Sequence, residues 1–410
     1  MNNWSPIIAQ PSIDHYLLPK KVRYILKAPY IPQDVMQNIG QMTSMLLELS
    51  CSLPDRIFRG SYEKMSDYLG YRKEQKEIFI KLNEKIESDV FARSDLVRIG
   101  NQWKLHELNV GSNLLTNLAV SSLPNISGFE QEFNALGKWA QIITKKWNFG
   151  KVFAFVIPKA YLEEAKVVLQ LFIPQLKKMA DQKFLILCEE DLIFKENRLE
   201  DHEEHKIDFV YPLFNEHSIE SAPTQFAYLL KAISCKVVLC PMGPTYSLVS
   251  NKGILALLWE LVGTRLLSSA ETDLVEAFVP KTVWVTKENF PFILENKNNL
   301  VLKPINYFQG INVWAGSEMT KEKWSILLLE ILSGSKNDKY VAQEFVPAEI
   351  NSILISDGHQ VIEENSLLTW GIYVFGNTLL GGMVRGRPTN SSVIFKAIDP
   401  LTYYGPLSKS

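Results

Sequence analysis

The sequence predicts a mixed α/β fold, and three patterns carry this prediction. Between residues 150 and 245, short apolar runs alternate with helical stretches, an order that is typical of a parallel sheet covered by helices. Residues 95–110 contain two strand-like runs on either side of Gly100-Asn101, which predicts a hairpin. Residues 367–395 predict two more strands around Gly376-Asn377, followed by a glycine-rich bend and a final strand.

Other elements follow from the spacing of apolar residues. Helical spacing is present over residues 34–50 and 72–91, and residues 162–180 look like a single helix. The apolar run at 236–241 predicts a strand, and the charged stretch 195–206 predicts a loop.

Length and composition narrow the class of protein. The 410 residues are 46% hydrophobic, enough for a large core and more than one domain. With 43 basic and 45 acidic residues the net charge is −2, so no basic stripe indicates a nucleic-acid partner. Four scattered cysteines favour a reduced, cytoplasmic protein. Neither a signal peptide nor an apolar run of the ~18 residues that a membrane span needs is present, so we expect no membrane partner.

Polar residues on the predicted hairpin are the strongest candidates for a functional site. Alternate strand residues face the same side, so Arg93 and Asp95 should point together, as should Glu107 and Asn109, while His106 should face the opposite side. Carboxylate and amide oxygens suit magnesium, and a guanidinium can stabilise a transferring phosphoryl group. The alternative is an ordinary solvated hairpin face.

Elements late in the chain are candidates for binding phosphates and a base. Lys303 ends an apolar strand, where an anionic partner would compensate its burial, although lysines often end strands without one. Lys252 begins a predicted helix, where the helix dipole disfavours a cation. Gly310 lets the backbone approach a phosphate. The segment 343–347 could hold an adenine edge or simply be a strand exit. Neither a Walker A motif nor GxGxxG occurs.

The stretch 202–205 contains two histidines and two glutamates and looks like a metal cluster. Its spacing is not HExxH and its neighbours are polar, so we interpret it as a solvated loop.

In this order, the motifs resemble those of ATP-grasp ligases, specifically the circularly permuted branch typified by the synthetase domain of glutathionylspermidine synthetase. The matching motifs are Arg93-Ser-Asp95, Glu107-Leu-Asn109, Asn251-Lys252-Gly253, Leu257-Leu258-Trp259, Leu302-Lys303-Pro304, Gln309-Gly310-Ile311-Asn312-Val313, Gly381-Gly382-Met383-Val384-Arg385-Gly386 and Ser392-Val393-Ile394. The resemblance spans roughly residues 90–395. It implies a circularly permuted ATP-grasp fold with a parallel α/β pre-ATP-grasp layer.

The resemblance also implies roles for individual residues. Arg93 would be the catalytic group that stabilises the transition state, and Ser112 would meet the carboxylate substrate. The magnesium ligands would be Asp95, Glu107 and Asn109. The residues that contact ATP would be Lys252, Lys303, Gln309, Gly310, Gln343, Glu344, Phe345, Val346, Val393 and Ile394.

The same resemblance divides the chain into four parts. Residues 1–92 would be a mostly helical region, 93–150 the metal-binding part of the core, 151–250 the pre-ATP-grasp layer, and 251–410 the nucleotide-binding lid with the rest of the core. One departure is that residues 306–310, the phosphate loop, lack the arginine seen in relatives.

The implied activity uses ATP and Mg²⁺ to activate a small carboxylate as an acyl phosphate. The first expectation is that an amino acid such as glutamate is transferred to the thiol of an acyl-carrier protein in antibiotic or other specialised biosynthesis, as in the ATP-grasp enzyme of butirosin biosynthesis. Alternatives are amide ligation to a polyamine or peptide, a phosphotransferase without ligation, and a non-catalytic ATP-binding module.

Overall fold

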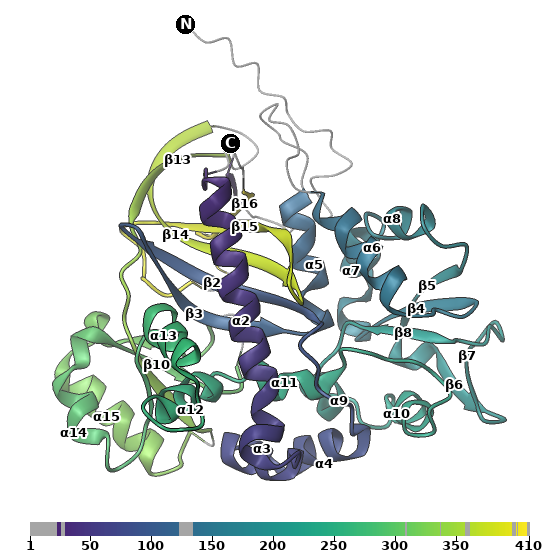
Figure 1. Ribbon diagram of the computed structural model, residues 1–410, viewed down its shortest axis with the longest axis horizontal. Coiled ribbons are helices and arrows are strands. Elements are labelled where there is room, and N and C mark those ends of the chain that lie inside the picture. Colours follow the sequence, from purple (N-terminus) through teal and green to yellow (C-terminus); the bar gives the residue numbers. More distant parts are fainter. Residues whose placement is uncertain are drawn as a thin grey trace, which may run out of the picture.

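A computed structural model describes residues 23–25, 29–122, 134–307, 310–336, 338–356, 361–395, 399 and 401–407. Over these residues the chain forms a seven-stranded sheet, a four-stranded sheet, a three-stranded sheet and a two-stranded hairpin, with helices packed around them (Figure 1). The predicted mixed α/β class is therefore confirmed. Among the described helices, none has the length and apolar character that crossing a bilayer requires.

The largest sheet has the strand order β13-β1-β16-β15-β14-β2-β3. Its strands are β13 (Ile350–Ser356), β1 (Arg23–Ile25), β16 (Tyr403–Pro406), β15 (Thr378–Pro388), β14 (Val361–Phe375), β2 (Phe91–Ile99) and β3 (Gln102–Val110). Because β13 also pairs with β14, five of these strands close into a ring. Both predicted hairpins are confirmed: β2 pairs with β3 across Gly100-Asn101, and β14 pairs with β15 across Gly376-Asn377. The glycine-rich bend and final strand expected after them are wrong, because β15 continues through Gly381-Gly382 to Pro388 and residues 389–395 form no strand.

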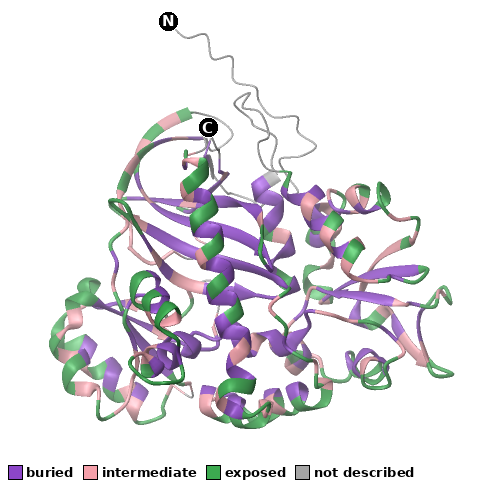
Figure 2. Ribbon diagram, in the orientation of Figure 1, coloured by how far each residue is buried: buried purple, intermediate pink, exposed green. Residues whose placement is uncertain are grey.

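Helix α2 (Gln33–Phe58) covers one face of this sheet, and Figure 1 shows it crossing in front of the strands. The Thr43 and Ser94 hydroxyls lie 2.9 Å apart, which places Ser94 of β2 on the α2 side. Its neighbours in the strand, Arg93 and Asp95, therefore point to the other face. The strands beneath α2 are largely buried (Figure 2).

Two short helices follow α2, namely α3 (Tyr62–Leu69) and α4 (Lys73–Leu82). The helix expected over residues 72–91 stops at Leu82, because Asn83 adopts a left-handed conformation with φ 44° and its N–H caps the Phe79 carbonyl.

A parallel α/β layer occupies the middle of the chain, as the alternating pattern predicts. Its strands are β4 (Val152–Ile157), β5 (Lys183–Cys188) and β8 (Phe209–Pro212), and its helices are α6 (Ala135–Lys146), α7 (Leu162–Leu169), α8 (Ile173–Lys177), α9 (Glu216–Ser221) and α10 (Ala227–Ser234).

Three predictions within this layer are wrong in detail. The helix expected at 162–180 is broken into α7 and α8, since Pro174 lacks the N–H that a continuous helix needs. The expected loop 195–206 contains strand β7 (Arg198–Asp201), which pairs with β6 (Leu192–Lys195). In place of a strand at 236–241, Leu239 forms one isolated bridge with Phe209.

The four-stranded antiparallel sheet has the order β11-β10-β12-β9. Its strands are β11 (Trp314–Ala315), β10 (Leu300–Pro304), β12 (Tyr340–Glu344) and β9 (Thr282–Trp284). One face packs on α14 (Phe290–Glu295) and α15 (Lys321–Leu332) through Leu302 and Ala342. Lys303 and Gln343 are their strand neighbours and so point to the opposite face.

Helix α12 (Gly253–Leu261) packs on that opposite face, where Ala256 contacts Ile305 and Val341. The remaining described α-helices are α5 (Leu115–Leu118), α11 (Ser247–Ser250) and α13 (Ser269–Phe278).

Candidate functional site

The polar face predicted on the β2–β3 hairpin is present, and most of it is buried. Arg93 lies opposite Asn109, and Asp95 lies opposite Glu107. The exposed fractions of Arg93, Asp95 and Asn109 are 6%, 3% and 7%. Charges withdrawn from water to this degree need partners. The interpretation of a solvated hairpin face is therefore wrong.

Asp95 lies between two guanidinium groups. Arg93 donates from Nε to Oδ1 at 2.7 Å and from a terminal nitrogen to Oδ2 at 2.9 Å, while Arg385 of β15 lies 2.9 Å from Oδ2. The amide nitrogen of Asn109 also donates to Oδ2 at 3.3 Å. Burial alone would raise the pKa of Asp95, but Arg385 and Arg93 outweigh burial and hold this pKa below its ordinary value.

A glycine makes room for this arrangement. Gly371 of β14 lies directly opposite Asp95, between β2 and β15. A Cβ at Gly371 would be 3.1 Å from Cδ of Arg93 and 3.2 Å from Cγ of Met383. The missing side chain thus leaves space for the stem of Arg93, whose guanidinium pairs with Asp95.

Lys252 and Glu107 form the third ion pair of the site. Lys252 immediately precedes α12, and its Nζ donates to Glu107 Oε1 at 2.7 Å and to the Tyr307 carbonyl at 2.6 Å. The neighbouring Asn251 amide donates to Asn306 at 2.6 Å. These contacts bring the end of β10 and the start of α12 onto the β2–β3 hairpin.

Lys303 brings the four-stranded sheet into the same site. Its Nζ donates to the His106 carbonyl at 3.0 Å and to Gln343 Oε1 at 2.5 Å. Burial lowers the pKa of Lys303 to about 8, and the nearby Glu107 charge only partly opposes this effect. At neutral pH the side chain is therefore still mainly cationic.

His106 is turned toward the site by a β-bulge. Asp95 pairs with Glu107 but Leu96 pairs with Leu105, so His106 is the extra residue in β3. Burial, and then the charge of Lys303, lowers the pKa of His106 to about 3, so the imidazole is neutral. The expectation that His106 faces away from the site is wrong, because strict alternation fails at the bulge.

The six ionised side chains of this cluster do not balance. Four positive charges against two negative charges leave a net charge of +2; the residues are Arg93, Lys252, Lys303 and Arg385 against Asp95 and Glu107. We call these six residues the charged cluster. A buried excess of positive charge favours an anionic ligand such as a chain of phosphate groups.

The donor set also fits a magnesium ion by its chemistry. Asp95, Glu107 and Asn109 offer carboxylate and amide oxygens on one face, as magnesium prefers. In the structure both carboxylates pair with cations, and Asn109 presents its nitrogen to Asp95. These cations would have to transfer to phosphate oxygens before a metal could be coordinated.

The other residues predicted to bind nucleotide surround the cluster at varying distance. Gln343 contacts Lys303 directly, and the buried Val346 makes a backbone hydrogen bond with His106. Glu344 and Phe345, between Gln343 and Val346, are held by backbone hydrogen bonds. Glu344 is exposed and its N–H donates to the Lys281 carbonyl at 2.8 Å. The Phe345 N–H donates to the Asn299 carbonyl at 2.7 Å. Their contact with adenine stays a prediction.

The two loops expected to cover the nucleotide are only partly described. Gly310 adopts φ +73°, whereas Gln309 lies outside the described residues. The Val393 N–H donates to Glu318 at 2.7 Å, and Arg387 donates to the Ile394 carbonyl. The closing segment therefore contacts the turn that follows β11.

Ser112 lies beyond the end of β3 and its hydroxyl is engaged by the fold. It is buried and contacts the Pro212 carbonyl and, at 2.9 Å, the Met242 carbonyl. Its proposed contact with substrate stays a prediction.

The stretch 202–205 supplies two members of a second group of possible metal ligands. Within the described part of the chain, Asp201, Glu203 and His205 have ligand atoms within 4.8 Å of one another. His205 Nδ1 lies 2.9 Å from one Asp201 oxygen, and the other oxygen accepts the N–H groups of Glu203 and His205 at 3.0 and 2.8 Å. These contacts complete the turn after β7. His202, Glu203 and Glu204 are exposed, in agreement with the interpretation of this stretch as a solvated loop.

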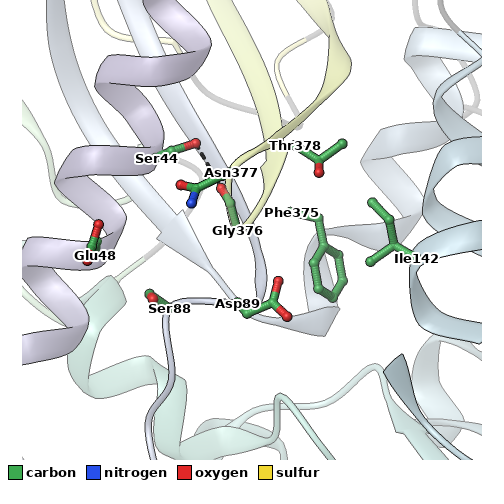
Figure 3. Close-up of a pocket in the computed structure, with 9 residues that line it drawn as sticks. All are labelled: Ser44, Glu48, Ser88, Asp89, Ile142, Phe375, Gly376, Asn377 and Thr378. Carbon is green, nitrogen blue, oxygen red and sulfur yellow. Dashed lines mark hydrogen bonds between the residues drawn. The ribbon is translucent and has the colours of Figure 1, made fainter. Parts of the chain in front are cut away.

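A cavity of about 240 Å³ opens beside the β14–β15 turn, on the α2 side of the sheet (Figure 3). Its nine lining residues include the carboxylates of Glu48 and Asp89 and no cationic side chain. Since phosphates need positive charge, this cavity is a poor candidate for the nucleotide.

Comparisons with known proteins identify the fold. No protein-family model and no curated protein sequence matches the chain. A glutathione synthetase-like effector from Globodera pallida superimposes with a TM-score of 0.61 at 13% identity, over 95% of this chain and 90% of that one. A putative gamma-glutamylcysteine synthetase from Methylobacillus flagellatus gives 0.41 at 12% identity, over 91% and 86%. D-alanyl-alanine synthetase A from Vibrio cholerae gives 0.34 at 10%, over 60% and 71%. The chain thus shares the fold of the Globodera pallida protein, in agreement with the predicted ATP-grasp type of fold; its circular permutation stays a prediction.

Proposed function

We propose that the chain is an ATP-dependent ligase that activates a small carboxylate and joins it to an amine. The observation that carries this proposal is the charged cluster, whose net charge of +2 would be balanced by a magnesium–ATP complex of charge −2. The fold shared with a glutathione synthetase-like effector supports an amine acceptor. A carrier-protein thiol, a role in antibiotic biosynthesis and the identity of the acid stay predictions.

The proposed reaction has two steps. A carboxylate oxygen attacks the γ-phosphorus of ATP, the bond between this phosphorus and the bridging oxygen breaks, and ADP leaves with that oxygen. The amine nitrogen then attacks the acyl carbon, inorganic phosphate leaves, and the amine loses a proton. The chain's part is to position the reactants and neutralise charge.

Residues of the charged cluster have distinct parts in this scheme. Lys252 and Lys303 would bind phosphate oxygens, and Arg93 would stabilise the charge on the transferring group. Magnesium, when bound, would neutralise further phosphate charge; its ligands would be Asp95, Glu107 and Asn109.

Acid-dependent release of ADP tests the proposal. The purified chain is incubated with magnesium, ATP, hydroxylamine and a panel of amino acids and γ-glutamyl peptides. We expect ADP and an acyl hydroxamate in equal amounts with at least one acid. Tight ATP binding without acid-dependent ADP release would favour a non-catalytic module, and a stable phosphorylated product would favour a phosphotransferase. Intact-mass measurements with amines and with a carrier protein then separate the two acceptors.

Gly371→Ala is expected to lower kcat about tenfold or more. The new methyl group would meet Cδ of Arg93 at 3.1 Å, so this atom must move by a few tenths of an ångström and displace the guanidinium that it carries. The methyl group would also crowd Cγ of Met383, and this overpacking should lower the free energy of unfolding by about 1–3 kcal/mol. Steady-state kinetics and urea unfolding check both effects. Unchanged kcat would show that the position of Arg93 does not limit the reaction.

A further inference from the structure

A chain of hydrogen bonds runs through three strands of the four-stranded sheet and ends on Lys303. The Thr282 hydroxyl of β9 donates to the Pro280 carbonyl at 2.8 Å, and the Gln343 amide of β12 donates Nε2 to the Thr282 oxygen at 3.1 Å. Gln343 Oε1 accepts from Lys303 Nζ of β10 at 2.5 Å. Beyond this chain, Lys303 Nζ also donates to the His106 carbonyl at 3.0 Å.

The direction of each bond in this chain is determined by its first member. A threonine hydroxyl has one hydrogen, and Thr282 donates it to Pro280. Toward Gln343 the oxygen of Thr282 can therefore only accept, so the NH₂ end of the amide must face it. The carbonyl end of Gln343 is then left to face Lys303.

Because Thr282 and Gln343 are buried, the orientation of the Gln343 amide affects whether Lys303 keeps a hydrogen-bond acceptor. The exposed fractions of Thr282 and Gln343 are 1% and 2%, so water does not readily replace a lost partner. If the amide were reversed, its two N–H groups would face the Lys303 ammonium, which is itself a donor only. The charged form of Lys303 would lose an acceptor in a place where burial already lowers its pKa to about 8.

We infer that Thr282 is a positioning residue that acts through Gln343: it orients the amide so that Lys303 stays charged and directed into the charged cluster. This inference rests on the proposed binding of phosphates by Lys303. It also gives Gln343 a role different from the adenine contact that the sequence predicts, since both ends of its amide are engaged within the protein.

Thr282→Val tests the inference, because it keeps the shape and removes only the hydroxyl. Affinity for a fluorescent ATP analogue is measured from pH 7 to 9.5. We expect affinity at pH 7 to fall about three- to tenfold, the worth of one hydrogen bond. The pH at which binding is half lost should fall by up to about one unit, because the charged lysine has lost an acceptor. Thr282→Ser should restore both values.

Thr245→Val is the matched control. Thr245 is also fully buried, but its hydroxyl has no hydrogen-bond partner within the described structure. We expect unchanged affinity and an unchanged midpoint. If Thr282→Val behaved as Thr245→Val does, the inference would be overturned.

A second variant gives a test that does not depend on Thr282→Val alone. Gln343→Glu presents an acceptor to Lys303 in either orientation, so it should raise the midpoint, and adding Thr282→Val should not change the midpoint further. A further decrease in the double variant would show that Thr282 acts by another route.

Chemical labelling keeps this test separate from the proposed function. The pH dependence of acetylation at Lys303, followed by peptide mass spectrometry without nucleotide, reports the same midpoint in the free protein. If the wild-type chain bound no ATP analogue, the proposed function would fail, and the labelling midpoints would still decide the relation between Thr282 and Lys303.

Discussion

Asp95→Asn is expected to abolish ATP-dependent ligation, with less than about 1% of wild-type kcat remaining. It should also lower the free energy of unfolding by about 3–5 kcal/mol. Both effects have one cause: Asp95 is 3% exposed and is the counter-charge that two guanidinium groups share, those of Arg93 and Arg385. An asparagine leaves these two cations, whose side chains are only 7% and 14% exposed, without a counter-charge. Acid-dependent ADP release and urea unfolding, both at a temperature where the variant is folded, check the two effects.

The double variant Asp95→Asn with Arg385→Met separates the two effects. Removing one of the two uncompensated charges should recover part of the stability while activity stays absent. Recovery of activity together with stability would show that Asp95 serves only the fold.

Glu271→Gln is the control for a lost carboxylate. Glu271 pairs with Arg56 at 2.9 Å, but both side chains are partly exposed. We expect a loss of no more than about 1 kcal/mol and unchanged activity.

The sequence was informative where chemistry follows local periodicity. Strand alternation correctly placed Arg93 with Asp95, and Glu107 with Asn109. The two pairs share one face only because of the bulge at His106, since counting from the turn would pair Asp95 with His106 and put Glu107 on the opposite face. The two lysines were candidates because an anionic partner would compensate the burial of Lys303 and because the helix dipole disfavours a cation at Lys252. That these two lysines lie beside the hairpin was inferred from the family resemblance, because spacing in the sequence does not predict it.

Features that depend on irregular register could not be predicted. The bulge that turns His106 into the site has no glycine or proline to mark it. Arg385 reaches Asp95 across β14. Because the register shifts between Tyr373 and Val374, counting residues from the turn does not give the position of Arg385 relative to β14. Thr282 lies far from Lys303 in the sequence, and only the pairing of β9, β12 and β10 brings the two together.

The ion pairs of the charged cluster link the binding of nucleotide to the binding of metal. Each carboxylate holds cations in place: Asp95 holds both guanidinium groups, and Glu107 holds Lys252. A triphosphate would compete for these cations and release carboxylate oxygens for a metal. Nucleotide and magnesium should therefore favour each other's binding, since each supplies the charge that the other displaces.

Lys303→Met is expected to weaken nucleotide binding at pH 7 at least about 30-fold without lowering the stability of the free protein. Burial lowers the pKa of Lys303 from 10.5 to about 8, so the folded state disfavours the charged form that the unfolded chain retains. Below pH 8 both states are protonated and the wild type bears the full cost of the buried charge. Between pH 8 and 10.5 the folded state releases its proton first, so the unfolded state binds more protons and wild-type stability rises relative to the variant.

Thermal unfolding should therefore show a Tm for Lys303→Met at least equal to the wild-type Tm at pH 7, and this advantage should shrink as the pH rises toward 10. The exposed Lys321 of α15 provides the control, since Lys321→Met should show no such dependence on pH. A difference in Tm that stays constant from pH 7 to 10 would mean that Lys303 contributes to the fold by packing alone. The folded state would then not be destabilised by a lysine charge that serves ligand binding.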